Sequence, residues 1–167
     1  MQLFRSVASL FATNDGRIRF VLRASCLAIA PSLLVFGLLV ALGSDTLRIP
    51  PGALDPASVV YSVLLAPAIE TALMLAFAIL LARLVPEHAA VQIVLIALVA
   101  ALAHGIWGNW RQAIRTTWPL LVYATSLVLW LRRSVKDAFM VTTIVHVLYN
   151  VAFFAVGILG ALATADE

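Results

Sequence analysis

Charged residues are scarce in this chain. Lys, Arg, Asp and Glu together make up 11% of its 167 residues, and 63% of the residues are hydrophobic. A soluble domain carries roughly a quarter charged residues, so these proportions exclude one and indicate an integral membrane protein. The net charge is +3. In such a chain a basic balance sets membrane topology rather than nucleic-acid binding, and no nucleic-acid partner is expected.

Cysteine is limited to Cys26, which excludes an intramolecular disulfide. Because Cys26 lies within an apolar run, packing is the simplest role for it. The residues before it, Arg23-Ala24-Ser25, lack the apolar start of a lipoprotein cleavage site. No cleavable signal peptide is evident either, so the first hydrophobic segment is expected to be retained.

Long hydrophobic runs separated by short polar breaks predict an all-α, polytopic transmembrane bundle that forms a single domain over residues 1–167. Before the first run, residues 1–19 repeat apolar side chains at helical spacing and predict a short amphipathic helix on the membrane surface. The five expected spans cover about 24–43, 57–82, 89–110, 116–131 and 138–162.

The basic residues are distributed unevenly over the expected loops. Eight of the eleven fall on the side of the N-terminus, and the other side has only Arg48, Arg111 and Arg115. The positive-inside rule therefore predicts a cytoplasmic N-terminus and an external C-terminus. Because arginine far exceeds lysine, as is typical of GC-rich bacterial genomes, the expected location is the bacterial cytoplasmic membrane.

Glu70 is the one charged residue in the 26 residues from Ala57 to Ala82. An ionisable group near the bilayer centre costs about 2.5–3.5 kcal/mol on insertion scales, so such a group normally faces a partner or a wet cavity. Polar residues in later spans can serve as that partner, namely His104, His146 and Asn150. At about 1.5 Å per residue, Glu70 lies roughly 20 Å and His104 roughly 9 Å below the outer surface.

The spacing of these residues allows them to converge. His146 and Asn150 are four residues apart and project from one helix face, between roughly 12 and 18 Å below the outer surface. Pro67 has no amide hydrogen, so it leaves the carbonyl of Val63 without its helical partner and is expected to kink the helix before Glu70.

A carboxylate and an imidazole that share a water molecule act as general base and then general acid. A second histidine and an amide donate hydrogen bonds to the oxyanion of a tetrahedral intermediate. Glu70, His104, His146 and Asn150 therefore form a peptide-hydrolysing set that needs no serine or cysteine nucleophile.

These residues, in this order over residues 60–155, resemble the CAAX-protease and bacteriocin-processing (CPBP) family of intramembrane glutamic endopeptidases. The family's motifs are Glu-Glu-x-x-x-Arg, Phe-x-x-x-His and His-x-x-x-Asn. The resemblance implies that Glu70 and His104 activate water, and that His146 and Asn150 bind the oxyanion. Three positions depart from the motifs, since this chain has Thr71, Leu75 and Ala100 where the family has Glu, Arg and Phe.

The leading expectation is an intramembrane endopeptidase without a cofactor that cuts a membrane-presented peptide or protein terminus. A zinc-dependent variant would use Glu70, His104 and His146 as ligands. A non-enzymatic alternative is an inactive CPBP-like scaffold or immunity protein whose polar cluster holds helices together. A b-type haem protein with His104 and His146 as axial ligands is a further alternative. The sequence leaves the oligomeric state open.

Overall fold

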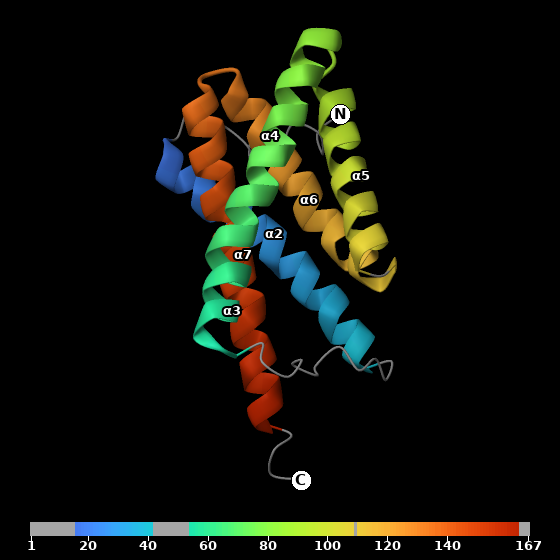
Figure 1. The fold of residues 1–167 in the computed structure, drawn as a ribbon, viewed down its shortest axis with the longest axis vertical. Helices are drawn as coiled ribbons and strands as arrows, with labels where there is room; N and C mark the ends of the chain where they lie inside the picture. Colours follow the sequence, from blue (N-terminus) through green and yellow to red (C-terminus); the bar gives the residue numbers. More distant parts are fainter. Residues whose placement is uncertain (1–15, 42–53, 109, 164–167) are drawn as a thin grey trace, which may run out of the picture.

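The computed structural model describes residues 16–41, 54–108 and 110–163, and over these ranges the chain is all-helical (Figure 1). Five helical segments are long and apolar enough to cross a membrane, as expected, and they define an integral membrane protein. The second span is continuous but contains three elements, α3, the π-helix η2 and α4. The element bounds are α2 Arg17–Ala41, α3 Pro56–Val60, η2 Tyr61–Leu65, α4 Ala66–Leu84, α5 Ala89–Trp107, α6 Trp110–Leu131 and α7 Val135–Ala163.

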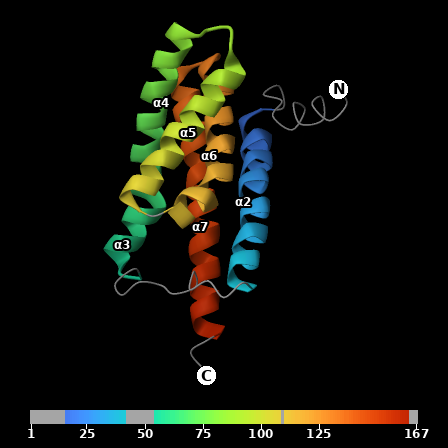
Figure 2. The same cartoon turned by 90° about the vertical axis from the view of Figure 1, so that its right-hand side faces the viewer.

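Helix α6 is the central element of the bundle. It packs against α2, α4, α5 and α7, and Figure 2 shows it lying between α5 and α2. Half of its membrane window is buried, compared with 22–28% in the other four spans. Its mean hydropathy of 1.2 is the lowest of the five, so the least apolar helix is the one withdrawn from lipid.

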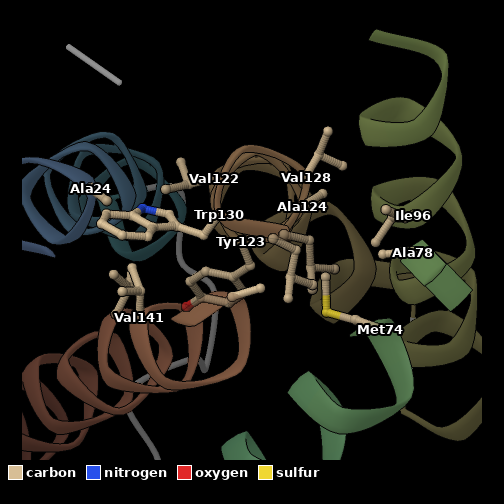
Figure 3. Close-up of a cluster of buried hydrophobic side chains, with 14 of the residues drawn as sticks. Ala24, Met74, Ala78, Ile96, Val122, Tyr123, Ala124, Val128, Trp130 and Val141 are labelled. Carbon is tan, nitrogen blue, oxygen red and sulfur yellow. The ribbon is translucent and has the colours of Figure 1, made fainter. Parts of the chain in front are cut away.

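The buried face of α6 carries large side chains that contact the surrounding helices. In Figure 3, Trp130 lies beside Ala24 of α2 and Val141 of α7, and Tyr123 projects towards α7. Trp130 also packs edge-on against Phe20 of α2, with ring centroids 5.4 Å apart. These contacts join α2, α6 and α7 into one core.

The threonine and serine hydroxyls of α6 bond to the helix itself. Thr116, Thr117, Thr125 and Ser126 each donate to the carbonyl four residues earlier, at 2.7–2.9 Å. A buried hydroxyl without a partner is costly, and these bonds remove that cost without requiring water.

The first span begins earlier than expected. Helix α2 starts at Arg17 rather than near residue 24, so residues 17–19 belong to it and not to a surface helix. Residues 1–15 of the expected surface helix lie outside the described residues. Arg17 forms a salt bridge of 2.8 Å with Asp137 at the start of α7, and this pairing explains how a basic residue is accommodated at the helix end.

The last span also begins earlier than expected, at Val135 rather than 138. Ser134 lies just before the helix, and its hydroxyl accepts a hydrogen bond of 2.9 Å from the backbone amide of Asp137. This is a serine N-cap, and the carboxylate of Asp137 lies in the first turn, where the helix dipole favours negative charge. Residues 135–137, which fall between the expected fourth and fifth spans, therefore belong to α7.

The turn between the third and fourth spans was also misplaced. Helix α5 ends at Trp107 and α6 begins at Trp110, so Trp110 opens the fourth span instead of closing the third. At Gly108 a Cβ atom would lie 2.8 Å from the carbonyl oxygen of His104, so the close turn requires glycine. This turn stops short of the lower ends of α2, α3 and α7 (Figures 1 and 2).

Candidate active site

Glu70 lies at the middle of its span. The helical segment Pro56–Leu84 has 29 residues, and Glu70 is fourteen residues from either end. Its side chain is 38% exposed. The carboxylate is therefore at the depth where ionisation is most unfavourable, and it is only partly covered by protein.

His104 reaches the same depth as Glu70, which corrects the expectation that it lies closer to the outer surface. Measured from the α4–α5 turn, Glu70 is fourteen residues before Leu84 and His104 is fifteen residues after Ala89. Both are thus about 21–23 Å along their helices. The Nε2 atom of His104 lies 3.7 Å from Oε2 of Glu70.

The ring of His104 is held by its own helix. Its Nδ1 lies 2.9 Å from the carbonyl oxygen of Ala100, one turn earlier. Since a carbonyl only accepts, this contact assigns the ring proton to Nδ1 and leaves Nε2 with a lone pair directed at the Glu70 side.

His146 approaches the same carboxylate oxygen from α7. Its Nε2 lies 3.6 Å from Oε2 of Glu70, and its side chain is only 7% exposed. Its Nδ1 is enclosed and has no hydrogen-bond partner among the described residues. A proton on Nδ1 would be buried without an acceptor, whereas a proton on Nε2 points towards Glu70. The contacts therefore favour the Nε2–H form, opposite to that of His104.

Asn150 is not directed at this cluster. Its Nδ2 donates a hydrogen bond of 2.9 Å to the carbonyl of Ser62, eight residues before Glu70 and thus about 12 Å along the helix. In η2, the backbone amide of Ala66 donates a hydrogen bond to the backbone carbonyl of Tyr61, five residues earlier. The same spacing pairs Ser62 with Pro67, which has no amide hydrogen, so Asn150 supplies the missing donor. The carbonyl that accepts this side-chain bond is therefore that of Ser62, one residue before the Val63 carbonyl expected from α-helical spacing.

The positions that depart from the family motifs lie in packed surroundings. Thr71 is fully buried and Leu75 is 8% exposed, both on the core face of α4. At Ala100 the backbone carbonyl, rather than the side chain, positions His104. Without a second carboxylate or an arginine at these positions, Glu70 is the acidic group of the cluster.

Tyr123 of α6 was not identified from the sequence as a site residue. Its ring stacks on that of His146, with centroids 4.3 Å apart and planes inclined by 29°. A tyrosine in the middle of a span is a weak signal, because it is equally consistent with packing. Only the central position of α6 brings Tyr123 to the site.

In a tetrahedral zinc site, bonds of about 2.1 Å place ligand atoms about 3.4 Å apart. The observed separations from Oε2 are 3.6 and 3.7 Å. Within the described part of the chain, no group of three or more His, Cys, Asp or Glu is arranged as a metal site. Zinc binding stays a prediction for experiment.

No protein-family model, curated protein or solved structure matches the chain. The resemblance to CPBP endopeptidases therefore depends on the motif residues and stays a prediction.

Proposed function

We propose that this protein is an intramembrane endopeptidase that hydrolyses a peptide bond with water activated by Glu70 and His104. The observation that carries the proposal is the position of Glu70 Oε2, which lies 3.7 Å from His104 Nε2 and 3.6 Å from His146 Nε2. One acid and two imidazoles from three helices thus meet in the middle of the membrane, where ionisable side chains are retained for function.

The proposed mechanism assigns different roles to the two histidines. A water molecule donates hydrogen bonds to the carboxylate of Glu70 and to Nε2 of His104, which leaves a lone pair on its oxygen free to attack the peptide carbonyl carbon. Glu70 takes the proton as the new C–O bond forms. It then returns this proton to the amine nitrogen as the C–N bond breaks.

In this mechanism His146 stabilises the intermediate. Its Nε2–H donates to the negatively charged oxygen that develops on the attacked carbonyl. The resemblance assigns this role to Asn150 as well, but its side-chain amide bonds to the Ser62 carbonyl and fixes α7 against the Glu70 helix instead.

The proposed substrate is a membrane-presented peptide or protein terminus, and the proposed location is the bacterial cytoplasmic membrane. Membranes from cells that produce the wild-type protein or Glu70→Gln can be compared by mass spectrometry of protein termini. New termini present only with the wild type are expected, because Gln keeps the size of Glu70 but cannot accept the water's proton. If both samples yield the same termini, the proposal is wrong.

A matched control removes a polar group away from the cluster. Thr125 is also on a spanning helix, and its hydroxyl bonds to its own helix at Leu121. Thr125→Val should therefore preserve every new terminus. Loss of cleavage in this control as well would show that the assay reports folding rather than chemistry.

A further inference from the structure

Two histidines must point their Nε2 atoms at the same carboxylate oxygen, and rotation about the Cβ–Cγ bond is only loosely restricted for a histidine ring. His104 is restrained by its bond of 2.9 Å from Nδ1 to the Ala100 carbonyl. His146 has no such bond, because its Nδ1 lacks a partner among the described residues. Another contact must therefore fix the plane of the His146 ring.

The stacked ring of Tyr123 is that contact. It covers one face of the His146 imidazole at a centroid distance of 4.3 Å. A rotation of the imidazole out of this plane would drive its edge into the phenol ring. Aromatic stacking of this kind favours one ring orientation several-fold.

The orientation of Tyr123 is itself fixed from two sides. Its ring packs edge-on against Tyr149 of α7, with centroids 6.1 Å apart and planes inclined by 81°. Only 1% of Tyr123 is exposed. Because Tyr149 lies three residues after His146 on the same helix, Tyr123 is wedged between two side chains of α7.

We propose that Tyr123 is a positioning residue, whose ring holds the His146 imidazole in the plane that aims Nε2–H at the reacting carbonyl oxygen. The role in catalysis rests on the proposed endopeptidase function, whereas the restraint on the ring does not. Because stacking needs the ring and not the hydroxyl, Phe should replace Tyr123 and Leu should not.

The ring can be observed directly, since the chain has only three histidines, His88, His104 and His146. Protein labelled with ¹⁵N-histidine in lipid nanodiscs should give three imidazole spin systems, assigned with His88→Gln and His146→Gln. In the wild type and in Tyr123→Phe, His146 should show one Nε2–H tautomer. In Tyr123→Leu its nitrogen shifts should move towards the average of the two tautomers, and those of His104 should stay unchanged.

Leu127→Ala is the matched control for lost packing. Leu127 is fully buried on α6, one turn beyond Tyr123. This variant should leave the His146 signals as in the wild type, even though it lowers stability. Unchanged His146 signals in folded Tyr123→Leu, or equal changes in Leu127→Ala, would overturn the inference.

Cleavage gives a second readout that separates this inference from the proposed function. With a substrate identified from the comparison of protein termini, Tyr123→Leu should reduce kcat by about threefold to tenfold with KM changed less than twofold. Tyr123→Phe should stay within twofold of the wild type in both constants. If the wild type cleaves nothing but the tautomer shift is seen, the restraint on His146 is supported and the endopeptidase proposal fails. Equal kcat in wild type and Tyr123→Leu contradicts a positioning role.

Discussion

The side-chain amide of Asn150 donates a hydrogen bond of 2.9 Å to the backbone carbonyl of Ser62, across the interface between α7 and η2. This carbonyl needs an outside donor because π-helical spacing pairs it with Pro67. One bond thus satisfies a polar group at membrane depth and sets the register between the Glu70 helix and the His146 helix.

Asn150→Ala should therefore lower the free energy of unfolding by about 0.5–1.5 kcal/mol, the usual net value of such a bond. Asn150→Asp should lower it at least as much, because a carboxylate cannot donate to a carbonyl. Unfolding of the reconstituted protein in increasing SDS measures both values. In a Pro67→Ala background, alanine supplies an amide near Ser62, so Asn150→Ala should have a smaller effect there. If Asn150→Ala lowers stability equally in both backgrounds, the loss does not come from the bond to the Ser62 carbonyl.

Replacing Glu70 separates the endopeptidase from the scaffold interpretation. In a catalytic cluster, a carboxylate at mid-membrane is retained at the expense of stability. Glu70→Gln should then abolish cleavage while the free energy of unfolding stays the same or rises. If the cluster instead holds the helices together, Glu70→Gln should lower stability, and the wild type should show no cleavage that the variant lacks. Unfolding in SDS and mass spectrometry of protein termini, performed on the same preparations, distinguish the two interpretations.

The number and type of spans could be predicted because each depends on local composition alone. Their ends could not, since they depend on contacts that the sequence does not display. Arg17 at the start of α2 pairs with Asp137 of α7, and the Ser134 cap starts α7 early. The depth of His104 was misjudged because the α5–α6 turn stops short of the lower ends of α2, α3 and α7, so the end of α5 does not mark the outer surface.

The candidate residues Glu70, His104 and His146 could be predicted because an ionisable or imidazole group stands out in an apolar run. Tyr123 could not, because its importance comes from the central position of α6. The bond of Asn150 was also missed, because it depends on a change from α- to π-helical spacing at Tyr61–Leu65.

Chelation tests whether the cluster needs zinc. If Glu70 and His104 activate water directly, cleavage by purified protein should survive prolonged dialysis against EDTA and 1,10-phenanthroline with less than twofold loss. Elemental analysis should then find well under one zinc per chain. Loss of activity that returns when zinc is added would instead establish the metal-dependent alternative.

Membrane orientation can be tested with single cysteines in a Cys26→Ser background. Asp55 precedes α3, and Arg132 lies in the α6–α7 turn at the opposite end of the bundle; both are exposed (Figure 1). The excess of basic residues at the Arg132 end predicts that it faces the cytoplasm. An impermeant maleimide should label Asp55→Cys in intact spheroplasts, and Arg132→Cys only after lysis. The reverse pattern would invert the assigned topology.

A second proline is compensated in the same way as Pro67. Pro31 interrupts α2 and has no amide hydrogen for the carbonyl of Leu27, four residues earlier. The indole Nε1 of Trp118 donates to that carbonyl at 2.6 Å, which ties α6 to α2. Trp118→Phe keeps an aromatic ring but removes the donor, so it should lower the free energy of unfolding by about 0.5–1.5 kcal/mol.

A double-mutant cycle isolates this bond from the packing of the indole. Pro31→Ala restores an amide at α-helical spacing from Leu27, so the carbonyl keeps a partner when Trp118 is replaced. Trp118→Phe should then lower stability less in the Pro31→Ala background than in the wild type, and the difference is the coupling energy of the bond. Identical losses in both backgrounds would mean that Trp118 stabilises the bundle through its ring alone. A smaller loss after Pro31→Ala would show that interhelical side-chain donors offset the proline breaks of this bundle.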